Sequence, residues 1–139
     1  MDRRPEVERA LTARVVPLLR ERGFTGSLPH FRRRLATKTD LVTFQFDRHG
    51  GGFVLEVAEG PSTEFVTSWG KVIPASRLTA YDINPPKRKR LRPGPGGAPD
   101  AWFRYDRDLS PDAVAIQVIS FLGQLDEWWT GVKDQPNIR

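Results

Sequence analysis

Residues 41–57 read LVTFQFDRHGGGFVLEV, and this stretch decides the fold. Apolar residues occupy every second position on both sides of a glycine-rich centre, a period of two that is typical of β-strands. Phe44 and Phe46 precede the glycines, and Leu55 and Val57 follow them. We therefore expect two antiparallel strands that are joined by a short hairpin turn.

The chain upstream of this hairpin shows the same alternation. Between positions 28 and 35, Phe31, Arg33 and Leu35 alternate with basic side chains, and a polar turn around 38–40 follows. We therefore expect a third antiparallel strand and a meander with one apolar face and one wet face. The wet face carries a mixed polar set, namely His30, Arg32, Arg34, Thr43, Gln45 and Glu56.

Helical periodicity precedes and follows these strands. In residues 5–22, apolar side chains recur every three or four positions, which predicts an amphipathic helix that bends at Pro17 and ends at Gly23. Near the C-terminus, Ser110 and the proline after it form a helix-start signal, and an apolar stripe continues to about Trp129. The sheet is therefore expected to lie between two helical segments in the sequence.

These elements predict one α+β domain over residues 1–139. A compact aromatic segment at 102–106 adds a strand, and residues 60–100 read mainly as loop with one short strand around 64–69. The expected architecture is a four- or five-stranded, mostly antiparallel sheet with the N-terminal and C-terminal helices packed on one face. Its expected core consists of Phe31, Phe44, Phe46, Leu55, Val57, Leu122 and Leu125.

The net charge of +5 is concentrated in one segment. The chain has 22 basic and 17 acidic residues, and five of the basic ones lie close together at 87–92. Without these five the charge is balanced. Because the surrounding sequence is rich in proline and glycine, we expect a flexible basic loop at 85–99. The five basic side chains are Lys87, Arg88, Lys89, Arg90 and Arg92.

Composition excludes several kinds of site. Cysteine is absent, which rules out disulfides, zinc–thiolate centres and thiol nucleophiles. His30 and His49 are the only histidines, and no motif gathers carboxylates around them, so we expect no metal site and no cofactor. No apolar run approaches the roughly 20 residues of a membrane span, and no secretory segment opens the chain. We therefore expect a cytoplasmic protein that does not enter a membrane.

Four stretches resemble a bacterial family of domains of unknown function, numbered 4304. They are VVPLLRERGFTGSLPHFRRRL at 15–35, LVTFQF at 41–46, FVLEV at 53–57 and AWFRYD at 101–106. The matching positions include a Gly-Phe pair after the leading helix, an aromatic followed by basic residues, a glutamine near a strand end and a strand tryptophan: Gly23-Phe24, Phe31-Arg32, Gln45 and Trp102. The resemblance implies the α+β fold and implies no activity.

Three functions follow from these features, in order of preference. The first is non-catalytic recognition of a protein partner, in the manner of an adaptor or a toxin-neutralising protein, through the wet face of the sheet with His30, Arg32, Arg34, Gln45 and Glu56. Trp69, in the loop-rich middle, is a further candidate anchor. The second is nucleic-acid binding through Lys87, Arg88, Lys89, Arg90 and Arg92. The third is an enzyme without a recognisable motif; the sequence does not predict the oligomeric state.

Overall fold

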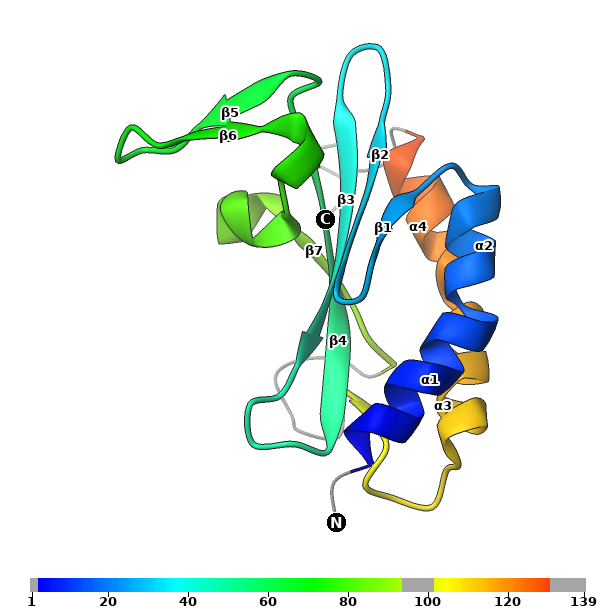
Figure 1. The fold of residues 1–139 in the computed structure, drawn as a ribbon. Helices are drawn as coiled ribbons and strands as arrows, with labels where there is room; N and C mark the ends of the chain where they lie inside the picture. Colours follow the sequence, from blue (N-terminus) through cyan, green and yellow to red (C-terminus); the bar gives the residue numbers. More distant parts are fainter. Residues whose placement is uncertain (1–2, 94–101, 131–139) are drawn as a thin grey trace.

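The predicted hairpin forms the centre of the sheet in a computed structural model that describes residues 3–93 and 102–130 (Figure 1). Strands β3 (Thr39–Phe46) and β4 (Gly52–Gly60) pair in antiparallel fashion over their whole length. Phe44 lies opposite Leu55, and the Asp47 N–H donates to the Gly52 carbonyl at the turn. The alternation at 41–57 therefore set the register of the two longest strands.

Shorter strands extend both edges of this central pair. The order across the sheet is β1-β2-β3-β4-β7, with β8 also paired to β4, and each of these pairs is antiparallel. The α+β prediction with an antiparallel sheet is confirmed, and the two strands on the β4 edge are only two and three residues long. The short strands are β1 (Thr25–Ser27), β2 (His30–Arg34), β7 (Lys89–Leu91) and β8 (Phe103–Arg104).

The four α-helices of the described residues lie on one face of the sheet (Figure 1). The N-terminal helical segment is α1 (Arg4–Arg14) followed by α2 (Val16–Glu21), so the bend expected from Pro17 is a break at Val15. The C-terminal segment, expected as one helix, is α3 (Pro111–Ile119) followed by α4 (Leu122–Trp129). This second break is a correction: the Phe121 N–H donates to the Val118 carbonyl at 2.9 Å, three residues back, and the Ser120 hydroxyl donates to the Gln117 carbonyl at 2.6 Å, so the α-helical pattern ends there.

Two predicted helix ends are confirmed. Gly23 has a φ of 93°, and the Phe24 N–H donates back to the Leu19 carbonyl at 3.0 Å, which closes the last turn of α2. At the other helical segment, the Ser110 side chain accepts a hydrogen bond from the Ala113 N–H at 3.1 Å. These caps hold the helices at fixed positions over the sheet.

The core between helices and sheet contains six of the seven predicted residues as fully buried side chains: Phe31, Phe44, Leu55, Val57, Leu122 and Leu125. Phe46 is only partly buried, which corrects the prediction for that residue. It lies at the end of β3, where the guanidinium carbon of Arg4 sits 4.2 Å from its ring centroid. A cation therefore covers part of this ring, which also packs against Phe53 and Tyr105.

The expectation of a wet outer face is wrong for the middle of β3 and β4. Leu41 and Ala58 point to the outer face of β3 and β4, and residues 61–91 fold over them to form a second apolar cluster with Ile73, Leu78, Ala80 and Ile83. Figure 1 shows this cover on the side of the sheet opposite the helices. This covering segment consists of β5 (Glu64–Val66), β6 (Val72–Pro74) and the 3₁₀ helices η1 (Ala75–Arg77), η2 (Ala80–Asp82) and η3 (Pro85–Lys87).

The basic segment is partly built into the sheet. Lys89–Leu91 form β7, and Leu91 is buried in the core on the helix side, so the expectation of a loop is wrong for these three residues. The rest of that expectation, from 94 to 99, lies outside the described residues. Within 3–93 and 102–130, no helix combines the length and the apolar character that crossing a bilayer requires.

Candidate functional site

The residues predicted as a recognition face divide into buried and accessible ones. His30, Arg32 and Arg34 lie on β2, Gln45 lies near the end of β3, and Glu56 lies in the middle of β4. Glu56 is only 3% exposed, whereas the others are partly or well exposed. Glu56 therefore has no surface with which to contact a partner directly, because residues 61–91 cover it.

His30 connects the sheet to the covering segment. Its Nδ1 lies 2.9 Å from Thr43 Oγ1, and the same hydroxyl accepts a hydrogen bond from the Ala80 N–H at 3.3 Å. The ring of Tyr81 packs against the His30 ring with 5.7 Å between centroids. Burial lowers the pKa of His30 below its ordinary value, and the charge of Arg32 lowers that pKa further. The neutral form of the histidine is thus favoured where it meets Thr43 and Tyr81.

Arg32 and Arg34 bind the backbone of the same covering segment. Arg32 Nε donates to the Leu78 carbonyl at 2.9 Å, and Arg34 Nη2 donates to the Ser62 carbonyl at 3.2 Å. These two carbonyls belong to residues on either side of the β5–β6 pair. The two arginines therefore position that pair, a role that their alternation in the sequence did not indicate.

Glu56 connects the two candidate binding surfaces, the polar face of the sheet and the basic segment. Arg90 Nε donates to Glu56 Oε2 at 2.5 Å, and Arg88 Nη1 lies 3.9 Å from Glu56 Oε1. Arg88 Nε also donates to the Ile83 carbonyl at 2.8 Å. Two of the five basic side chains therefore neutralise a buried carboxylate, and the structure does not bring Lys87, Lys89 and Arg92 into this cluster.

The β5–β6 hairpin is the most exposed apolar feature. Phe65 and Ile73 lie opposite each other and pack inward on the second apolar cluster. Val66 and Val72, the next pair, are 59% and 52% exposed, and Trp69 in the turn is 75% exposed. Large apolar side chains exposed together mark interaction surfaces more often than single ones do. We call Val66, Trp69 and Val72 the hairpin patch.

The turn of this hairpin is well ordered by its own hydrogen bonds. The Thr67 N–H donates to the Lys71 carbonyl at 2.9 Å, and the Lys71 N–H donates to Thr67 Oγ1 at 2.9 Å. Gly70 takes a positive φ of 88°, which lets the chain reverse within the turn. Trp69 is thus presented on a short, closed tip instead of a long loop.

The hairpin patch and the residues that hold it lie within a region that matches a known protein family. A family model described as a domain of unknown function, DUF4304, matches residues 15–133. The chain belongs to this family. No curated protein and no solved structure matches it.

The DUF4304 match assigns no chemistry to any residue, because the family description states no activity. It spans the sheet, the covering segment and the hairpin patch, and begins after α1. In the described part of this DUF4304 chain, no three histidine, aspartate or glutamate side chains come together as metal ligands would.

Sequence reasoning identified one of the three residues in the hairpin patch of this DUF4304 domain. Trp69 was recognised as a candidate anchor, whereas Val66 and Val72 were not, because their strands have three residues each and show no periodicity. The signal that was present is the Ser-Trp-Gly sequence at 68–70 between two short apolar runs. A glycine two residues before a second apolar run, as Gly70 is before Val72, is typical of a hairpin turn.

Proposed function

We propose that this DUF4304 domain is a non-catalytic recognition domain that binds a protein partner through the hairpin patch. The observation that carries the proposal is the exposure of Trp69, 75% of whose surface is accessible at the tip of a projecting hairpin (Figure 1). Tryptophan is enriched among the residues that dominate binding energy at protein interfaces. A tryptophan and two valines exposed to water favour an apolar pocket on the partner.

The attachment of the hairpin supports the proposal. Phe65 and Ile73 pack on the outer face of the sheet, and Arg32 and Arg34 donate to carbonyls on both sides of the hairpin. A hairpin fixed in this way loses little conformational entropy when it binds, so more of the contact energy remains for affinity. The predicted recognition residues Arg32 and Arg34 on β2 thereby contribute to the proposed interface by holding the hairpin in position.

The hairpin also offers unpaired strand edges. β5 and β6 pair with each other and with no other described strand, and Pro74 removes one N–H from β6. A partner that inserts an apolar pocket over Trp69 gains backbone hydrogen bonds if it adds a strand to the outer edge of β5. We propose that the partner is a protein of the bacterial cytoplasm and that the two form an adaptor or toxin-neutralising pair. Cell fractionation tests the cytoplasmic location.

Photo-crosslinking tests the proposed interface directly. A benzoyl-phenylalanine at position 69, in the full chain expressed in its host, is expected to form an adduct with one defined protein, which mass spectrometry identifies. The same amino acid at position 116 is the matched control, because Ile116 is 53% exposed on α3, which packs on the opposite face of the sheet. Adducts of equal yield and identity from both positions would contradict the proposal.

Binding of the identified partner is then measured with purified variants. Trp69→Ser is expected to weaken binding by at least about 30-fold, the loss of a roughly 2 kcal/mol anchor. Ile116→Ser is expected to leave affinity unchanged. If position 69 instead crosslinks to a second copy of this chain, the hairpin patch mediates self-association. The proposal that it recognises another protein would then be wrong.

A further inference from the structure

The hydrogen bonds within the β5–β6 hairpin determine which of its backbone groups remain for a partner. The Ala75 N–H donates to the Thr63 carbonyl at 2.6 Å, and the Thr67 N–H donates to the Lys71 carbonyl at 2.9 Å. In an antiparallel pair, successive residues point their N–H and C=O groups alternately toward the partner strand and away from it. Every second residue of β5 and of β6, beginning next to these bonds, therefore turns its backbone groups to an outer edge.

The outer edge of β5 is open. Glu64 and Val66 face it, and none of their backbone N–H or C=O groups is bonded to another described residue. Glu64 is exposed and forms no ion pair within the described residues, and Val66 is 59% exposed. A strand edge of this kind is a template for pairing with another chain, and here it lies beside an accessible carboxylate and an accessible valine.

Two other outer edges are protected. On β6, Val72 and Pro74 face outward, and the proline has no N–H to donate. On β1, Arg20 Nη2 donates to the carbonyl of Gly26, the middle residue of the strand, at 2.7 Å. Proline and long basic side chains on an edge discourage the addition of a further strand. The edge of β5 has neither protection, and it continues directly into the turn that carries Trp69.

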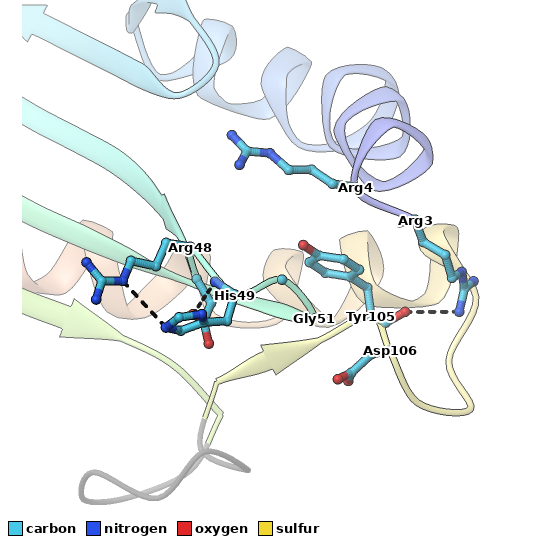
Figure 2. A pocket seen from close by; sticks show the side chains of 9 residues that line it. Arg3, Arg4, Arg48, His49, Gly51, Tyr105 and Asp106 are labelled. Carbon is cyan, nitrogen blue, oxygen red and sulfur yellow. Dashed lines mark hydrogen bonds between the residues drawn. The ribbon is translucent and has the colours of Figure 1, made fainter. Parts of the chain in front are cut away.

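The opposite end of the sheet offers a different kind of surface. Figure 2 shows Arg3, Arg48 and Asp106 around an open pocket at the β3–β4 turn. The backbone there is already paired, since the Tyr105 N–H donates to the Gly51 carbonyl at 2.9 Å. Charged side chains of both signs and a paired backbone do not suit an apolar, extended partner. The β5 edge, by contrast, combines free backbone groups with the apolar hairpin patch.

We infer, on the basis of the proposed function, that the partner presents an extended segment that adds to the outer edge of β5 as an antiparallel strand. Antiparallel pairing is the more stable arrangement per residue. The partner residue opposite Val66 is apolar and the one opposite Glu64 is basic, because apolar pairs and opposite charges stabilise neighbouring strands. Since the two strands run in opposite directions, the partner segment reads apolar-x-basic from its N-terminus.

Short linear peptides, selected from a random phage-displayed library on the immobilised full chain, are the probe. We expect the selected peptides to share the apolar-x-basic order and to lose affinity for Trp69→Ser. Hydrogen exchange of the ¹⁵N-labelled chain, followed by NMR, then reports on the strand edge. The amides of Glu64 and Val66 should exchange rapidly in the free chain and become protected in the complex. The outward amide of Val72, on the other edge of the hairpin, is the internal control and should stay unprotected.

A matched pair of proline variants tests the same hydrogen bonds. Val66→Pro and Val72→Pro each remove one exposed valine and one outward N–H, at positions that lie opposite each other in the hairpin. Proline is tolerated on an edge strand where the N–H faces solvent, and the dispersion of the NMR spectrum checks that each variant folds. We expect Val66→Pro to weaken peptide binding about tenfold more than Val72→Pro does. Glu64→Lys should weaken binding of the same peptides by about three- to tenfold.

The inference and the proposed function fail in different ways. Peptides that require Trp69 but leave the amides of Glu64 and Val66 unprotected would overturn strand addition and keep the hairpin patch as the interface. Equal losses in Val66→Pro and Val72→Pro, or a library that yields no peptide dependent on Trp69, would overturn it as well. An unchanged affinity of the crosslinked partner for Trp69→Ser would instead contradict the proposed function itself.

Discussion

Arg90 on β7 and Glu56 on β4 stand opposite each other in the strand register, and Arg90 Nε donates to Glu56 Oε2 at 2.5 Å. The Glu56 side chain is nearly inaccessible, whereas about a third of the Arg90 side chain is exposed. A buried carboxylate without a partner is costly, so this pair fixes β7 against the edge of the sheet. The basic segment is thus a structural partner of the outer sheet face.

Removing Arg90 should therefore destabilise the domain. We expect Arg90→Gln to lower the free energy of unfolding by about 1.5–3 kcal/mol, the range for a hydrogen bond to a charged group. The larger losses of fully buried pairs are not expected, because Arg90 is partly solvated and Arg88 stays near Glu56. Urea denaturation followed by fluorescence measures the change.

The neighbouring arginine supplies the control for this experiment. Arg92 forms no ion pair in the described structure, and Arg92→Gln should change stability by less than about 0.5 kcal/mol. In the double variant Glu56→Gln, Arg90→Gln, part of the loss should be recovered, since no buried charge is left unpaired. Equal effects of Arg90→Gln and Arg92→Gln would show that the pair does not hold β7.

The pattern in residues 41–57 predicted the central strands because residues 41–46 and 52–57 lie in long, regularly alternating elements. β7 could not be predicted in this way. Its sequence, Lys-Arg-Leu, has two charges and one apolar residue, and it forms a strand because β4 has a free edge and Leu91 fits the core. Such pairing depends on residues more than 30 positions apart, which local periodicity does not record.

In the candidate site, too, the local sequence pattern does not reveal contacts with segments that are distant in the sequence. Glu56 and Arg32 alternate with apolar residues as surface side chains do, and from the sequence they look alike. The covering segment buries Glu56 and leaves Arg32 partly exposed, with its guanidinium on the Leu78 carbonyl. The covering segment therefore decides which residues of the outer face are buried, and its own sequence shows no sustained periodicity.

The lowered pKa of His30 predicts a pH dependence of stability. Burial, and next the charge of Arg32, lower the pKa of His30 in the folded state below 6.5, the ordinary value that we take for the unfolded chain. The unfolded state then binds the proton more readily, so this contribution to stability is complete above pH 6.5 and is lost as the pH falls below it. Urea titrations between pH 8 and pH 5.5 should show this decrease.

Two variants isolate the contribution of His30. His30→Gln should remove its part of the decrease, and Arg32→Gln should reduce it, because the charge that disfavours the imidazolium is gone. An NMR titration of the His30 ring protons measures the pKa directly. A midpoint at or above 6.5 in the folded chain would contradict the prediction.

Phe44 should be among the most sensitive core positions. It is buried, and its ring packs against Phe31 and Phe53 with centroids 5.9 and 6.1 Å apart. Phe44→Ala is expected to cost about 3–5 kcal/mol, from lost burial and from the cavity that remains. Ile116→Ala, at an exposed apolar position, is the control and should cost under about 1 kcal/mol. A loss below 1 kcal/mol for Phe44→Ala in urea denaturation would contradict its place in the core.

Nucleic-acid binding through the basic segment, the alternative function, has a distinct salt signature. Arg88 and Arg90 are directed at Glu56, which leaves Lys87, Lys89 and Arg92 to contact phosphates. Binding to duplex DNA releases about 0.9 counterions per neutralised phosphate, so three contacts give a slope of about −2.7 in log K against log salt, and five contacts give about −4.5. We expect any DNA binding by this segment to follow the shallower slope and to disappear in the triple glutamine variant at 87, 89 and 92.

The same variant separates the two functions. Partner binding through Trp69 should persist when Lys87, Lys89 and Arg92 are neutralised, because the hairpin patch is apolar. A partner that ignores Trp69→Ser but is lost in the triple variant would reverse the preference and make the basic segment the recognition surface. A DNA slope near −4.5 would in addition require Arg88 and Arg90 to leave Glu56, and the free energy of breaking these contacts would then weaken the DNA affinity.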